Sequence, residues 1–166
     1  MGMRGILTWD GEPFEYLADA WTEADCKKLA VVIGSCQGQA VWEALALLIA
    51  MRTWAYYWSA RWCIVRVKSD SKAALGAMEK ERSKASSMNL IARELSLDRA
   101  LAEREPLYEF GHVRGKSNEW GDALSRLAQP GSGAVVPPPL DKVTRRNVQS
   151  RGAGWWRTCW LQQVPL

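Results

Sequence analysis

The stretch HVRGKSNEWGDALSRL, residues 112–127, decides the fold expected for this chain of 166 residues. The pattern predicts the end of a strand, a turn, and a helix that is capped by Asn118 or Ser117 and carries Asp122 in its first turn. This order places the imidazole of His112 and the carboxylate of Asp122 at the same end of a sheet. Sites in α/β folds are commonly built at that end. Taken singly, His112 is a loop residue and Asp122 a favourable acid near a helix N-terminus.

Two further carboxylates are placed where a shared site would need them. Asp70 follows the alternating segment CIVRVKS, residues 63–69, and precedes a predicted helix. Glu43 lies in the first turns of a long apolar helix predicted over residues 41–58. We therefore expect these two acids to meet His112 and Asp122 in space.

These four side chains resemble the ribonuclease H domain of retroelement reverse transcriptases. Residues 112–127 are similar to the ending HVxGxxNxxADxLSRL of that family in long-terminal-repeat and related elements, with Gly121 where alanine is usual. The resemblance spans roughly residues 1–130, as far as boundaries can be placed from one sequence. It implies an α/β fold with a ribonuclease H-like mixed sheet flanked by helices.

The resemblance also implies a reaction, the hydrolysis of the RNA strand of an RNA–DNA hybrid. Two Mg²⁺ or Mn²⁺ ions about 4 Å apart would activate the attacking water and stabilise the leaving oxygen. Glu43 would bridge the ions, Asp70 and Asp122 would each bind one, and His112 would shuttle protons during product release. The implied partners are an RNA–DNA hybrid or other nucleic acid and an upstream reverse transcriptase sequence.

The charge distribution limits how nucleic acid would be bound. The net charge is +4, but residues 1–127 carry equal numbers of acidic and basic side chains, so the excess belongs to the tail. Contact with a duplex must then come from local placement, for which residues 61–84 are the best candidate, and a solvated loop is the alternative. The candidate contacts are Lys72, Arg82, Lys84, Arg114, Lys116 and Asn118.

The sequence departs from the family at its beginning. Ribonuclease H domains open with a central strand that carries the first catalytic aspartate, whereas residues 2–16, GMRGILTWDGEPFEY, resemble the hairpin that follows it. Asp10 is the nearest acid, but its Asp-Gly context predicts a turn at the wrong end of a strand for metal binding. We therefore expect the first central strand to be missing, two sheet edges to be unpaired, three of the four metal-binding carboxylates to be present, and activity to be impaired. Three explanations stay open: a true start upstream of Met1, a truncated relic, or another segment or chain in the gap.

The remaining pattern predicts one domain and a tail. We expect strands at 4–9, 14–18, 63–69 and after Pro106, helices at 41–58, 71–79 and 87–102, and irregular chain over 23–39. By the resemblance, we expect residues 1–128 to form the ribonuclease H-like domain, incomplete at its N-terminus. Residues 129–166 are rich in proline and glycine at first and basic afterwards, a composition that predicts disorder.

Composition favours an intracellular protein without a membrane segment. The cysteines show no CxxC pair, so neither a zinc site nor a disulfide framework is indicated, although nucleus and cytoplasm are not distinguished. Only eight residues lie between Glu43 and Arg52, fewer than the ~20 needed for a membrane span. Three tryptophans of the predicted helices are expected to pack in the core: Trp42, Trp54 and Trp58.

Three classes of function follow from these expectations. The first is a metal-dependent endonuclease of ribonuclease H ancestry. The second is a non-catalytic nucleic-acid-binding remnant of a retrotransposon. The third is a protein-interaction module that uses the exposed sheet edges.

Overall fold

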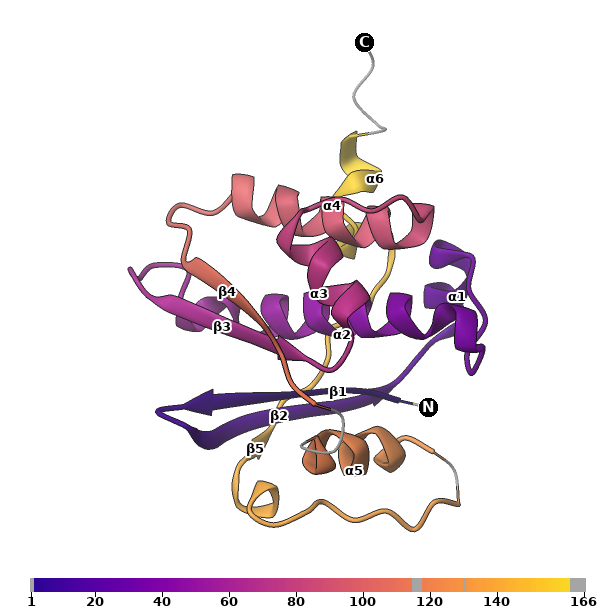
Figure 1. Cartoon of the computed structure of the whole chain (residues 1–166), viewed down its shortest axis with the longest axis vertical. Helices are drawn as coiled ribbons and strands as arrows, with labels where there is room; N and C mark the ends of the chain where they lie inside the picture. The colour runs from indigo at the N-terminus through magenta and orange to yellow at the C-terminus, as the bar shows by residue number, and fades with distance from the viewer. Residues whose placement is uncertain (1, 115–117, 130, 162–166) are drawn as a thin grey trace.

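A computed structural model of the chain describes residues 2–114, 118–129 and 131–161. They form a mixed α/β fold in which helices surround the strands, as the sequence predicts (Figure 1). The strands are β1 (Gly2–Trp9), β2 (Glu12–Ala20), β3 (Ile64–Ser69), β4 (Leu107–His112) and β5 (Thr144–Arg145). The helices are α1 (Glu23–Leu29), α2 (Gln39–Trp54), α3 (Lys72–Glu79), α4 (Ser86–Ala100), α5 (Glu119–Leu127) and α6 (Thr158–Leu161).

The predicted hairpin at the start of the chain is present. β1 and β2 pair antiparallel from Gly2 opposite Ala20 to Trp9 opposite Glu12. The turn between them has positive φ at Asp10 (51°) and Gly11 (90°). Glycine and aspartate tolerate this left-handed backbone, which suits the twist of a tight hairpin.

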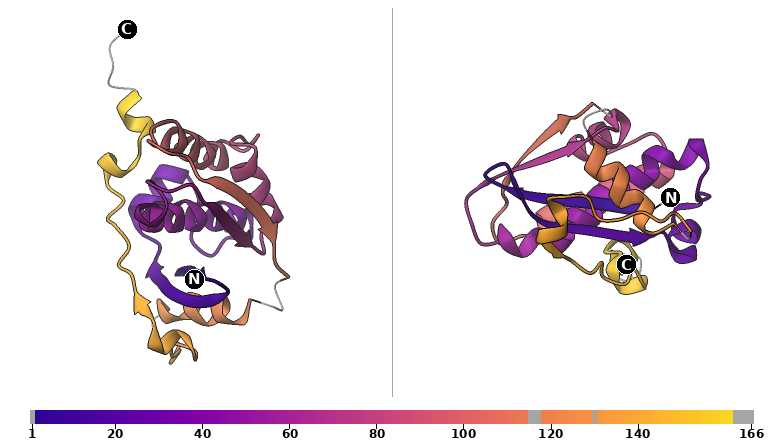
Figure 2. Two further views of the ribbon diagram at one scale, coloured as in Figure 1. Left: turned by 90° about the vertical axis from the view of Figure 1, so that its left-hand side faces the viewer. Right: turned by 90° about the horizontal axis from the view of Figure 1, so that it is seen from below.

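The strands form two separate sheets. One has the order β1-β2-β5, with β5 parallel to β2, and the other pairs β3 with β4 in parallel from Ile64 opposite Leu107 to Ser69 opposite His112. Among the described strands, none pairs with both β1 and β3. In the described part of the chain the two sheets are therefore not joined by a shared strand (Figure 2).

Helix α2 is the centre of the core. It contacts β1 on one side and α3 and α4 on the other, and its apolar side chains are buried nearly all round (Figure 1). The ring of Trp42 lies against Trp21 with centroids 4.8 Å apart. Trp42, Trp54 and Trp58 are all buried, which confirms the packing role predicted for them.

Helix α1 corrects the prediction of irregular chain over residues 23–39. The hydroxyl of Thr22 accepts a hydrogen bond from the backbone N–H of Asp25, and the Asp25 carboxylate accepts one from the backbone N–H of Thr22. This is a capping box, which satisfies two backbone donors at the start of a helix. The sequence TEAD, residues 22–25, therefore indicates a helix start, although the glycines later in the segment favoured irregular chain.

The tail differs from the disorder predicted for it, because its described part lies against the domain. It runs along one side of the molecule, where β5 pairs with β2 and the later residues reach α1 and α4 (Figure 2). Leu140 and Trp156 are buried. Composition predicted a solvated linker, but these apolar side chains and three arginines find partners on the domain surface.

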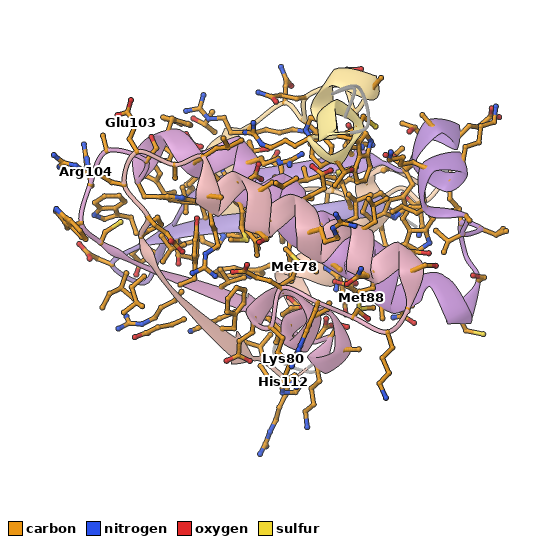
Figure 3. All side chains as sticks on the ribbon, turned by 90° about the horizontal axis from the view of Figure 1, so that it is seen from above. Met78, Lys80, Met88, Glu103, Arg104 and His112 are labelled. Atoms are coloured by element: carbon orange, nitrogen blue, oxygen red, sulfur yellow. The ribbon has the colours of Figure 1, made fainter. Side chains whose placement is uncertain are left out.

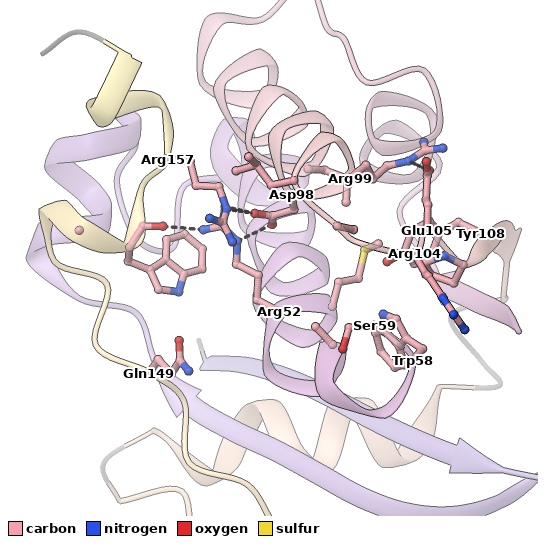
Figure 4. A pocket seen from close by; sticks show the side chains of 18 residues that line it. Arg52, Trp58, Ser59, Asp98, Arg99, Arg104, Glu105, Tyr108, Gln149 and Arg157 are labelled. Atoms are coloured by element: carbon pink, nitrogen blue, oxygen red, sulfur yellow. Dashed lines mark hydrogen bonds and ion pairs between the residues drawn. The ribbon is translucent and has the colours of Figure 1, made fainter. Parts of the chain in front are cut away.

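A cavity of about 460 Å³ is lined by the C-terminal ends of α2 and α4, the start of β4 and part of the tail (Figure 4). Its walls include Trp58, Tyr108 and Trp155, together with the ion pair between Arg52 and Asp98. Within the described part of the chain, none of the helices combines the length and apolar character that crossing a membrane requires.

Candidate functional site

The ends of β3 and β4 form the edge at which the predicted residues meet. The two strands are parallel and Ser69 pairs with His112, so Asp70, which follows Ser69, lies beside the histidine. The Nε2 atom of His112 is 3.2 Å from the backbone carbonyl oxygen of Asp70, to which the ring can only donate. The His112 side chain is exposed and lies at the periphery of the molecule (Figure 3).

Two helices supply the other predicted acids. Glu43 comes from the N-terminal part of α2, and its side chain is 19% exposed. Asp122 comes from the first turn of α5, and its side chain is 54% exposed. The structure therefore brings Glu43, Asp70 and Asp122 together from three separate elements, as the sequence predicts.

Asn118 contributes to the site rather than to its helix. It occupies the N-cap position of α5, one of the two predicted, but its side chain makes no capping hydrogen bond. Its amide Nδ2 instead donates to the carboxylate of Asp70 at 3.3 Å. The alternative cap, Ser117, lies outside the described residues.

Arg4 occupies the middle of the carboxylate cluster. Its Nη2 atom lies 3.8 Å from Glu43, 3.5 Å from Asp70 and 3.6 Å from Asp122, measured to the nearest carboxylate oxygen. These distances are within ion-pair range, and none of the three contacts has hydrogen-bond geometry. One guanidinium thus faces three carboxylates without tight contact to any.

Gly121 leaves the space through which Arg4 reaches the acids. A Cβ atom at this position would lie 2.9 Å from Nε of Arg4 and 2.4 Å from Oδ1 of Asn118. Real side chains essentially never approach so closely, so any larger residue would displace both neighbours. The absence of a side chain at Gly121 is therefore part of the site's geometry.

The cluster has more negative than positive charge. Burial raises the pKa of Glu43 most strongly; Arg4 opposes this rise, and the nearby Asp70 and Asp122 add to it. The net pKa of Glu43 is above its ordinary value of 4.5. Burial is therefore the main cause of the raised pKa of Glu43, and the two aspartates add to it because one arginine faces three acids.

The predicted nucleic-acid contacts fall into two groups. Lys72 in the first turn of α3 and Arg114 just beyond β4 are exposed beside the carboxylate edge. Arg82 and Lys84 are exposed in the link between α3 and α4, beyond the far end of a helix about 12 Å long. Lys116 lies outside the described residues. Near the carboxylates the structure places the first group and Asn118, whose amide contacts Asp70, but not Arg82 and Lys84.

The arrangement does not fit the two-ion group that the resemblance implies. Mg²⁺ binds oxygens at about 2.0–2.1 Å, whereas the three acids are spread around Arg4 at 3.5–3.8 Å. Among the described residues, no cluster of three or more acids, histidines or cysteines has an arrangement that could hold a metal ion. The guanidinium group of Arg4 lies at the point on which the three carboxylates converge.

The sequence pattern identified the acids but not Arg4. Arg4 is the single charged side chain of β1, whose sequence is GMRGILTW, and this isolation was the one available signal. Only the tertiary structure shows that it points at the acids. The cavity beside the tail belongs elsewhere, because Arg52 in its wall is nine residues from Glu43 along α2, about 13 Å.

Comparison with known proteins adds no relative. No family model matches the chain, and searches of curated proteins and of solved structures find no match. The functional argument therefore depends on the geometry of the site itself.

Proposed function

We propose that this chain is a ribonuclease H-like domain of retroelement reverse transcriptase lineage, with an impaired capacity to hydrolyse RNA in RNA–DNA hybrids. The observation that carries this proposal is the convergence of Glu43, Asp70 and Asp122 within 3.5–3.8 Å of one atom of Arg4. The three acids belong to α2, the end of β3 and α5. A carboxyl group such as Glu43, whose pKa is raised by burial and by neighbouring acids beside a specific charged partner, marks a candidate functional site.

The neighbours of the acids support the same proposal. His112 lies at the same edge, within hydrogen-bond distance of the Asp70 backbone, and its ring is exposed to solvent. Asn118 orients the Asp70 carboxylate. Impairment follows from Arg4, which stands among the acids, and from the poor fit to divalent ions.

Cleavage of a hybrid whose RNA strand carries an end label tests this function. With Mn²⁺ in excess, we expect the full chain to cut the RNA strand slowly and to leave the DNA strand intact. Asp70→Asn should abolish the cutting, whereas Arg66→Gln, which alters an exposed arginine on the solvent side of β3, should preserve it. Equal cutting by Asp70→Asn, or no cutting after prolonged incubation, would contradict the proposal.

A second candidate is binding of the hybrid without turnover, and Arg4 is the observation that favours it. The guanidinium lowers the negative charge of the edge, and the exposed Lys72 and Arg114 flank it. Binding of this kind depends on phosphate contacts and weakens steeply with salt. A fluorescence anisotropy titration at low salt measures it, and undetectable binding there rules it out.

A further inference from the structure

The cation at the centre of the carboxylate cluster is permanent. Arg4 belongs to β1, where its backbone pairs with Ala18, and its side chain is 15% exposed. A guanidinium group in a protein carries a positive charge. The three acids therefore always have a positive partner that the chain itself supplies.

Arg4 and a divalent ion compete for the same place. A metal ion would need oxygens from the acids at about 2.0–2.1 Å, so the carboxylates would have to close on the space that the guanidinium fills. The two positive charges would also repel each other over a short distance in a partly buried site. Occupancy by one therefore opposes occupancy by the other.

The absence of a side chain at Gly121 provides the space that the Arg4 guanidinium occupies. The position that a Cβ would take at Gly121 is within 2.9 Å of Nε of Arg4. The other close neighbour is the side chain of Asn118, which also contacts Asp70. Both neighbours are flexible side chains of the site, so a side chain at residue 121 would disturb the site without a clash with backbone.

We propose that Arg4 is the resident cation of this site, admitted by the absence of a side chain at Gly121, and that it excludes divalent ions from Glu43, Asp70 and Asp122. The inference rests on the proposed function only for the expectation that divalent ions belong at such a cluster. Its observable consequence is that removal of the guanidinium creates a divalent-ion site.

Titration of the full chain with Mn²⁺, with free ion followed by electron paramagnetic resonance, tests this directly. We expect Arg4→Ala to bind Mn²⁺ about tenfold or more tightly than the unaltered chain, because a competing charge is lost. Adding Asp70→Asn to Arg4→Ala should reverse the gain. Equal affinity of the unaltered chain and Arg4→Ala overturns the proposal, as does a gain that survives Asp70→Asn.

Gly121→Ala provides a second test that does not remove the arginine. It should raise the Mn²⁺ affinity in the same direction but less, because the arginine is displaced rather than lost. Two controls bracket the result: Arg4→Lys keeps a positive charge and should stay close to the unaltered chain, and Arg66→Gln should change nothing. If Arg4→Ala does not fold, unchanged affinity in Gly121→Ala overturns the proposal.

The binding assay and the cleavage assay fail independently. If no variant cuts the hybrid while the Mn²⁺ affinities follow the expected order, the proposed function fails and the role of Arg4 stands. If the unaltered chain cuts the hybrid and binds Mn²⁺ as tightly as Arg4→Ala, the function stands and the role of Arg4 fails.

Discussion

In two regions of this molecule arginines lie among three acids, but the contact distances and the direction of the carboxyl pKa shift differ between the regions. In the carboxylate site, Arg4 alone faces its acids at 3.5–3.8 Å. Where the tail meets α1, α2 and α4, three arginines face three acids, and the contacts of Arg52 and Arg151 are 2.6–2.7 Å long. We call this second region the tail clamp; its members are Arg52, Arg151, Arg157, Asp25, Glu94 and Asp98.

The tail clamp is a balanced network whose acids are satisfied. Glu94 is fully buried and accepts hydrogen bonds from Arg52, from the backbone N–H groups of Arg157 and Thr158, and from the Thr158 hydroxyl. Burial by itself raises the pKa of Glu94, but the bonds from Thr158, Arg52 and Arg157 outweigh it and hold the pKa below its ordinary value. In contrast, the pKa of Glu43 in the carboxylate site is raised.

This difference separates a structural role from a functional one. Charges that are paired in number and bonded at short distance hold the tail in place. The acids of the carboxylate site outnumber their arginine, lie at longer distance from it and are partly exposed, as is typical of a binding or catalytic site. Removal of an acid should therefore destabilise the fold in the tail clamp and stabilise it in the carboxylate site.

The largest expected effect is the loss of the buried pair between Arg151 and Asp25. These side chains are 3% and 0% exposed and are joined by two hydrogen bonds of 2.7 Å. Arg151→Met leaves the Asp25 carboxylate buried without its charged partner, which should lower the free energy of unfolding by about 3–5 kcal/mol. Urea unfolding followed by tryptophan fluorescence measures this. A loss as small as that of an exposed pair would mean that the tail does not dock as described.

Acid should loosen the tail clamp through Glu94. Its folded-state pKa lies below the ordinary value of 4.5, so its contribution to stability is present above about pH 4.5 and is lost as pH falls through the folded pKa. The effect is about 1.4 kcal/mol for each unit by which the two pKa values differ. Between about pH 3 and 7, the free energy of unfolding should depend less on pH in Glu94→Gln than in the unaltered chain. An equal pH dependence in the two proteins would contradict the role given to Glu94.

The opposite sign is expected at Glu43. Its pKa is raised, first by burial and then by Asp70 and Asp122, so the charged form costs stability as pH rises through the folded pKa. Glu43→Gln removes that charge at nearly constant shape and should stabilise the fold by on the order of 1 kcal/mol near pH 7. The gain should shrink toward pH 4. A variant less stable than the unaltered chain at pH 7 would remove the contrast between the two regions.

The smallest effect is expected where an ion pair belongs to neither region. Arg66 and Glu109 join β3 to β4 at 2.9 Å, but both side chains are mostly open to solvent, at 68% and 48% exposed. Arg66→Gln should change the free energy of unfolding by about 0–1 kcal/mol, which makes it the matched control for both regions. Thermal unfolding at low and high salt checks this value.

Most of the correct predictions concern short-range interactions, and helix α1 is an exception. The turn at Asp10 and Gly11 was predictable because two adjacent residues set its backbone. Asp70 and His112 were predicted at one edge because parallel strands end on the same side, and β3 and β4 pair in this way. Helix α1 was missed although its capping box, Thr22 with Asp25, is local and was visible in the sequence.

The tail was misjudged for a different reason. Its prolines, glycines and basic residues are typical of disordered chain when counted by composition. Arg151 is buried only because Asp25, far away in sequence, presents a carboxylate at the start of α1. No local pattern in residues 129–166 contains that information.

The sequence by itself determined the α/β class and most elements, because periodicity and turn residues are encoded over short segments, and its resemblance to ribonuclease H domains singled out the acids Glu43, Asp70 and Asp122. Only the tertiary structure decided that Arg4 stands among those acids and that Gly121 gives it room. The physical reason is that the charge balance of a site depends on which distant side chains packing brings together. Because of Arg4 in β1, the site predicted to bind metal ions contains a cation supplied by the chain itself.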